Sequence, residues 1–150
     1  MSDARSARDH GIPPRRPPGG MTRLGAWPVA DLSGLATVRA VVRDAIAAVV
    51  PSGAAARRLA EQATLLASEL TTNALEHGGG PAQVELRADD GSLLLDVADR
   101  DEGSAPVLAG QREPGDGGFG LVIALRLAAE VGWYRAAGGK HVWARLSLDA

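Results

Sequence analysis

Residues 66–80, LASELTTNALEHGGG, place a glutamate, an asparagine and a histidine four residues apart on a segment that otherwise has the pattern of a buried helix. Helical positions four apart drift by only about 40°, so Glu69, Asn73 and His77 lie along one row. Relative to the apolar stripe of the same helix, Glu69 falls at the edge and Asn73 nearer the middle, where an unpartnered polar group is costly. Something polar is therefore expected in the space that this row lines.

Each side chain of the row also has an ordinary structural interpretation. A glutamate can accept a proton or orient a hydroxyl, and an amide oxygen can bind a hard cation such as Mg²⁺. Taken alone, however, Glu69 and Asn73 favour a solvated helix edge, because polar pairs at this spacing are common. His77 falls in the last turn, where the helix dipole favours a cation, and it fits a capping role as well as a functional one.

Hydrophobic periodicity predicts the elements around this row. Helices are expected over residues 35–49 and 54–77, and a short edge strand over residues 24–29. Residues 82–88 alternate apolar with polar side chains, and the turn DDG leads from them into residues 92–99, a pair that is typical of an antiparallel hairpin with one covered face.

The second half of the chain predicts a lid, a helix and a closing hairpin. Residues 100–118 are rich in glycine, proline and polar side chains, which is typical of a functional loop. Residues 119–131 are almost wholly apolar and predict a third helix, and residues 131–148 predict two strands. The fold class is therefore α/β: a two-layer sandwich of a mixed, mainly antiparallel sheet covered on one face by three helices.

Composition indicates one domain behind a tail. The chain has 150 residues, 45% hydrophobic and 23% charged, which are ordinary globular values. Residues 1–22 hold few large apolar side chains and predict a disordered tail, with a single domain over residues 23–150. The PPRRPP stretch in the tail fits a polyproline-type ligand, but a solvated tail is the better interpretation.

Charge and cysteine content exclude several classes of function. A formal net charge of -2 argues against nucleic acid as the main partner. The chain has no cysteine, which excludes disulfides and thiolate chemistry, and no apolar run long enough to span a membrane. A cytoplasmic protein with no membrane partner is expected.

Two further features add to the polar row. In the strand at 92–99, Leu93, Leu95, Val97 and Asp99 share the face that meets the core. The Asp99 carboxylate could accept a hydrogen bond from an exocyclic amine in a pocket, although alone it fits a strand-terminal turn. Beyond the lid, GDGGFGLVI places glycines where backbone N–H groups favour phosphate, although a glycine cluster also suits a flexible helix entry.

In this order, the features resemble the histidine-kinase-like (GHKL) ATPase domain with its Bergerat fold, and specifically the small bacterial anti-sigma-factor serine/threonine kinase branch. SELTTNALEHG (68–78) resembles the N box of that family. The resemblance implies that Glu69 is the catalytic base, that Asn73 is the Mg²⁺ ligand, and that Asn73 and His77 belong to the nucleotide site.

Two glycine boxes extend the resemblance. DVADRDEGSAP (96–106) resembles the first, which implies that Asp99 binds adenine and Gly103 contributes to the cofactor site. GGFGLVIALRLA (117–128) resembles the second. The cofactor-binding positions implied there are Gly118, Phe119, Gly120 and Leu121.

The function implied is that of an ATP-dependent protein serine/threonine kinase with ATP and Mg²⁺ as cofactors. By resemblance, its substrate is a serine on a STAS-type anti-sigma-factor antagonist, and its other partner is a sigma factor. Members of the branch often pair, so a homodimer is a further expectation.

One departure keeps a second function open. The first glycine box usually reads D-x-G-x-G, whereas Asp101 stands at its middle glycine position and adds a negative charge near the nucleotide. This favours, as an alternative, a non-catalytic module of the same fold that sequesters a regulatory protein. Arg100, Arg112 and Lys140 are equal candidates to neutralise phosphate. The catalytic fragment of a sensor histidine kinase is a third reading, weakened because no helical segment with a phosphoacceptor histidine precedes the domain.

Overall fold

Five strands form a single sheet in the computed structural model, which describes residues 12–77, 80–100, 126–136 and 138–148. All four pairings between neighbouring strands are antiparallel, so the expected mixed sheet is antiparallel throughout its named strands. The order across the sheet is β1-β2-β3-β5-β4. The strands are β1 (Thr22–Val29), β2 (Ala82–Ala88), β3 (Ser92–Ala98), β4 (Glu130–Ala136) and β5 (Gly139–Ser147).

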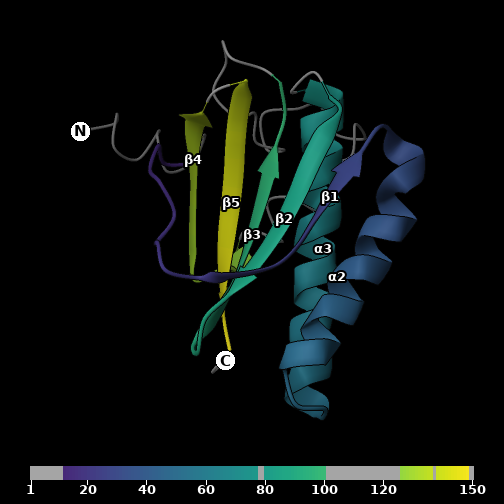
Figure 1. The fold of residues 1–150 in the computed structure, drawn as a ribbon, viewed down its shortest axis with the longest axis vertical. Helices are drawn as coiled ribbons and strands as arrows, with labels where there is room; N and C mark the ends of the chain where they lie inside the picture. Colours follow the sequence, from purple (N-terminus) through teal and green to yellow (C-terminus); the bar gives the residue numbers. More distant parts are fainter. Residues whose placement is uncertain (1–11, 78–79, 101–125, 137, 149–150) are drawn as a thin grey trace.

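Two long helices cover one face of this sheet and confirm the two-layer α/β sandwich (Figure 1). They are α2 (Leu35–Val49) and α3 (Ala54–His77), and both form where the periodicity predicts. A short 3-10 turn, η1 (Leu32–Gly34), precedes α2, and the Asp31 carboxylate accepts the Ser33 N–H there at 2.9 Å. Neither long helix is apolar enough along its length to cross a membrane.

The core lies between the helices and the sheet, with β3 at its centre. Leu93, Leu95 and Val97 point from β3 into the helix-side core, where they meet the buried stripe of α3. Leu94 points to the opposite face of the sheet and packs with Trp143 and with Met21, which precedes β1. Side chains on both faces of β3 are therefore buried, which fixes its register, because a slip of one residue would exchange the two faces.

Residues 12–21 correct the expectation of a disordered tail over residues 1–22, whose last residue, Thr22, begins β1. The Arg15 N–H donates to the Trp133 carbonyl at 2.8 Å, and the Trp133 N–H donates to the Pro13 carbonyl at 3.0 Å, so the segment pairs with β4. Ile12 is buried in the helix-side core and Met21 in the smaller cluster. In Figure 1 this segment runs beside β4 and then crosses the sheet to β1.

Burial and main-chain hydrogen bonds hold this segment more firmly than its ion pair does. Arg15 Nη1 lies 3.1 Å from Glu130 Oε2, but the pair is exposed and contributes about 0–1 kcal/mol. Burying one large apolar side chain such as Ile12 contributes about 1.5–3 kcal/mol. Composition indicated disorder because it does not reveal that apolar anchors stand at both ends of the proline-rich stretch.

The third predicted helix, over residues 119–131, is wrong at its end. Glu130 and Val131 belong to β4 and pair with Arg145 and Ala144 of β5. Only Arg126 and Leu127 are helical in the part that the structure describes, and the remainder of the prediction lies outside it, together with the lid beyond Arg100. The Val131 side chain packs against the core from β4. A short apolar run fits a buried strand as well as a buried helix, so the sequence pattern could not distinguish them.

We expect Gly132→Ala to destabilise the fold, because a methyl group there would lie 2.7 Å from the Trp143 ring and 2.8 Å from Arg15 Cγ. Overpacking of this kind costs about 1–3 kcal/mol, measured as a lower midpoint of urea denaturation. Gly91→Ala is the matched control, since a methyl group at Gly91 meets no atom within 4 Å. Equal midpoints for the two variants would contradict the described packing of Trp143.

Candidate functional site

The polar row of α3 is arranged as its spacing predicts. Asn73 is buried, with 6% of its surface exposed, Glu69 is half-buried, and His77 is exposed at the last residue of the helix. The row therefore runs from a half-buried carboxylate through a buried amide to an exposed imidazole. A buried amide and a half-buried carboxylate on one helix face can serve a polar ligand while one side remains open to solvent.

Topology brings the end of β3 to the same end of the fold as the last turns of α3. The chain leaves α3 at His77 and enters β2 at Ala82, and β2 then pairs antiparallel with β3, with Gln83 opposite Ala98. Asp99 follows directly and is buried. The structure thus places Asn73, His77 and Asp99, which are far apart in the sequence, at one end of the sandwich.

Asp99 pairs with a lysine that the sequence offered only as a candidate for phosphate. Lys140 Nζ lies 3.5 Å from Asp99 Oδ2, and each side chain is only 3% exposed. The Asp99 N–H also donates to the Lys140 carbonyl at 2.9 Å, which extends the ladder between β3 and β5 past the end of β3. Lys140 is therefore directed at the carboxylate to which the resemblance assigns adenine.

The alternation of side chains along β5 indicates that Lys140 lies on the core-facing side and needs a partner. Val142, Ala144 and Leu146 face the core from β5, and Lys140 shares their face. A lysine on a core-facing position needs a partner of opposite charge, and Asp99 occupies the matching position on β3. Of the other candidates for phosphate, Arg100 is exposed, and Arg112 lies outside the residues that the structure describes.

The remaining predicted cofactor positions also fall outside the described ranges. They are Gly103, Gly118, Phe119, Gly120 and Leu121. Their roles stay predictions from the sequence.

A groove of about 430 Å³ lies elsewhere, between the end of α2 and the start of α3. Ile46, Val50, Ala56 and Ala60 supply its apolar side chains, with Arg57 among its polar ones. Ala60 and Asn73 are thirteen positions apart on α3, which corresponds to about 20 Å along the helix axis. This groove is therefore separate from the end of the fold that holds Asp99.

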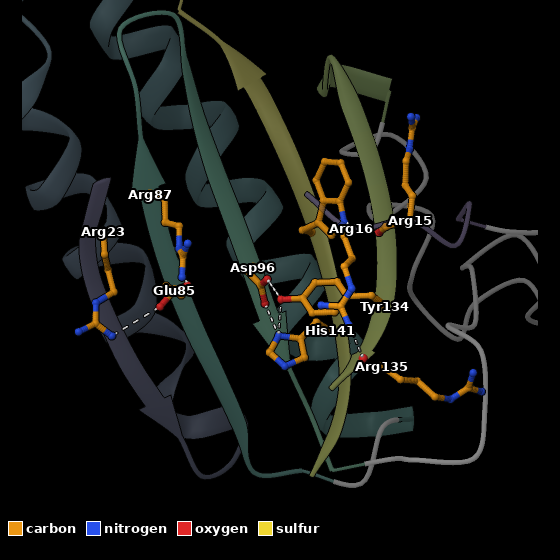
Figure 2. A network of polar contacts seen from close by, with 10 residues as sticks. Arg15, Arg16, Arg23, Glu85, Arg87, Asp96, Tyr134, Arg135 and His141 are labelled. Carbon is orange, nitrogen blue, oxygen red and sulfur yellow. Dashed lines mark hydrogen bonds and ion pairs between the residues drawn. The ribbon is translucent and has the colours of Figure 1, made fainter. Parts of the chain in front are cut away.

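The face of the sheet opposite α2 and α3 carries a second polar cluster, which the sequence did not reveal (Figure 2). The Tyr134 hydroxyl donates to Asp96 Oδ2 at 2.7 Å, and His141 Nδ1 lies 2.7 Å from Asp96 Oδ1. The Tyr134 and His141 rings stack with centroids 4.6 Å apart, and the Arg16 guanidinium lies 4.9 Å from the Tyr134 centroid. Because β3 alternates, Asp96 and Asp99 point to opposite faces, and this cluster is separate from the Asp99 end.

The comparison with protein families decides the identity of the fold. The chain matches the histidine kinase-like ATPase domain over residues 29–146, which is most of its length. The chain belongs to this family. A comparison with curated proteins gave no match. The match supports ATP binding by this ATPase domain, and both Asn73 and Asp99 lie inside the matched range.

Asn73 fits the requirement for a magnesium ligand in such an ATPase domain. Mg²⁺ prefers oxygen ligands and usually binds through one or two protein groups together with phosphates and water. The Asn73 side chain offers one amide oxygen from a buried position on α3. Among the residues that the structure describes, no cluster of three or more histidine, cysteine or acidic side chains could hold a metal ion.

We expect Tyr134→Phe to lower stability without affecting ATP binding, because it removes a hydrogen bond to a carboxylate on the face of the sheet opposite α2 and α3. The loss should be about 1–2 kcal/mol at neutral pH, measured by urea denaturation. ATP affinity, measured by calorimetry, is the control. A tenfold loss of affinity would contradict the separation of this cluster from the nucleotide end.

The stability difference between wild type and Tyr134→Phe should also depend on pH. Burial, together with the Asp96 carboxylate, raises the pKa of Tyr134 well above its ordinary value of 10. Because the unfolded tyrosine ionises first, the stabilisation is complete below about pH 10 and declines as the pH rises beyond it. A difference that stays constant from about pH 8 to about pH 11 would contradict the raised pKa.

Proposed function

We propose that this ATPase domain is an ATP-dependent protein serine/threonine kinase of the anti-sigma-factor type. In this proposal it phosphorylates a serine on a STAS-type anti-sigma-factor antagonist and regulates a sigma factor by binding it. The observation that carries the proposal is the common end of α3 and β3, where Asn73 and Asp99 are buried within the matched domain. A cytoplasmic location and pairing as a homodimer belong to the same proposal.

Glu69 is the group that we assign to the acceptor hydroxyl. It is half-buried, so a serine from a docked partner can reach it from solvent while the helix fixes its direction. In the transfer step, the serine oxygen forms a bond to the γ-phosphorus, the bond to the bridging oxygen breaks, and ADP leaves. The hydroxyl proton passes to Glu69, which acts as a general base.

Asn73 and Asp99 would position the nucleotide for this step. The Asp99 carboxylate would accept a hydrogen bond from the exocyclic amine of adenine, and the Asn73 amide oxygen would serve as a ligand for the cation. Bound Mg²⁺ would neutralise charge that develops on the phosphates. Phosphoryl transfer depends mainly on positioning and charge neutralisation, so these roles together with Glu69 suffice for a kinase.

A second candidate function rests on Asp101. Asp101 stands at the middle glycine position of the first glycine box, where, by the resemblance, its carboxylate would bring a negative charge near the nucleotide. A domain with weakened nucleotide affinity could still sequester a regulatory protein without transferring phosphate. Retention of Glu69 and Asn73 supports the kinase over this module.

Calorimetry with ATP tests the nucleotide site. We expect saturable binding that depends on Mg²⁺, with a loss of tenfold or more for Asp99→Asn, equivalent to about 1.4 kcal/mol. Asn73→Ala should weaken binding with Mg²⁺ and have little effect without it. Arg145→Met, on the other face of β5, serves as the control. No binding by the wild type at millimolar ATP would favour the sequestering module.

Glu69→Ala separates catalysis from binding. We expect it to retain ATP affinity and to lose at least about a hundredfold in phosphate transfer, since a general base contributes about 10²–10⁴-fold. The measurement is the rate of serine phosphorylation on a STAS-type antagonist that the wild type phosphorylates. Glu76→Ala, an exposed carboxylate on the same helix, is the matched control. Transfer by Glu69→Ala at the wild-type rate would show that the assigned role is wrong.

A further inference from the structure

The ion pair between Lys140 and Asp99 joins two charges that are almost completely shielded from water. Each side chain is 3% exposed, and Nζ lies 3.5 Å from Oδ2. Removing both charges from water carries a large desolvation penalty, so such a pair is weak evidence for stability. The more informative question is what the lysine does to the carboxylate beside it.

Main-chain contacts fix the backbone of Asp99 independently of the lysine side chain. The Asp99 N–H donates to the Lys140 carbonyl at 2.9 Å. Gly139 lies so close to the Asp99 carbonyl that a side chain at residue 139 would collide with it. The main chain of Asp99 is therefore held at the end of β3 by these contacts, and the Lys140 ammonium group adds a positive charge beside the carboxylate.

A buried carboxyl without a nearby cation favours its protonated form, because burial disfavours the charged form. A protonated carboxyl carries a hydroxyl donor on one oxygen and has lost part of its capacity as an acceptor. An exocyclic amine on a base needs an acceptor. The ability of Asp99 to recognise the base therefore depends on a group that keeps it ionised.

We propose that Lys140 is a positioning residue of the nucleotide site, which keeps Asp99 ionised so that its carboxylate can accept the exocyclic amine of the base. This inference rests on the proposed function, in which Asp99 binds adenine. The separation of 3.5 Å is longer than the 2.7–2.9 Å of a tight charge-assisted hydrogen bond. Lys140 thus places its positive charge beside the carboxylate at a distance longer than that of a short hydrogen bond.

Other charged groups stand near this end of the sheet and enter the design of the test. Glu69 and His77 belong to the last turns of α3, Arg135 of β4 is the strand neighbour of Lys140, and His141 faces the opposite side of β5. Arg100 follows Asp99 directly. The first residues of β2, Ala82 and Gln83, do not titrate. Because several charged groups lie at this end, the test must assign any pH dependence to Asp99 itself.

The test compares ATP with purine riboside triphosphate, which lacks the exocyclic amine, at several pH values. Both ligands carry the same triphosphate, so the ratio of their dissociation constants cancels the titration of the phosphates. The full chain is measured by calorimetry as wild type, Lys140→Met, Lys140→Arg and Asp99→Asn/Lys140→Met. Lys140→Gln provides a second neutral variant if Lys140→Met is unstable.

We expect the wild type and Lys140→Arg to favour ATP by a ratio that is constant from about pH 6 to about pH 8.5. Lys140→Met should lose this preference as the pH falls and regain it as the pH rises, by up to about tenfold per pH unit. The sign follows because losing the cation raises the pKa of Asp99, so the ionised acceptor exists only at higher pH. The double variant should show neither the preference nor its pH dependence.

The other outcomes distinguish failure of the inference from failure of the proposed function. Lys140 does not have the proposed role if Lys140→Met keeps the wild-type ratio of the two dissociation constants at every pH. The same holds if the double variant still shows a pH dependence. Neither result would contradict ATP binding. If the wild type binds ATP and purine riboside triphosphate equally well, Asp99 does not recognise the exocyclic amine, and the inference about Lys140 is overturned with it. No binding of either triphosphate by the wild type would overturn the proposed function.

Discussion

The packing of α3 against β3 is the constraint on which the rest of the structure depends. The buried stripe of α3 packs on Leu93, Leu95 and Val97. This contact fixes the position of the helix along the strand. The same packing brings Asn73 and Asp99 to one end of the fold. The core and the proposed site therefore cannot vary independently, because a shift of the helix along the strand would separate the amide from the carboxylate.

Much of the fold could be predicted from local patterns because both long helices and the sheet bury one face. Period-3.6 and period-2 repeats are visible wherever apolar and polar sides differ, as in α3 and β2. The pattern failed over residues 130–131, where an apolar run suits a buried helix and a buried strand equally well. It also failed over residues 12–21, because hydrogen bonds made by the main chain of Arg15 leave no trace in side-chain composition.

The candidate site was likewise only partly predictable from local sequence patterns. The spacing of Glu69, Asn73 and His77 predicted a shared row with Glu69 at the edge of the apolar stripe and Asn73 nearer its middle, and alternation placed Asp99 on the core side. The contact between Asp99 and Lys140 required knowledge of which strands are neighbours, and β3 pairs with β5 although 40 residues separate their facing ends. The cluster of Asp96, Tyr134 and His141 depends on the same non-local pairing, so local periodicity could not reveal it.

The pairing of residues 13–15 with β4 has a consequence for how copies of this chain can associate. An exposed strand edge offers unpaired N–H and C=O groups to any other strand, and native proteins block such edges. The N-terminal segment covers part of the β4 edge, while β1 at the other edge carries a register shift between Arg23 and Gly25 and a proline at residue 28. Continuous sheets across two molecules are therefore disfavoured at both edges.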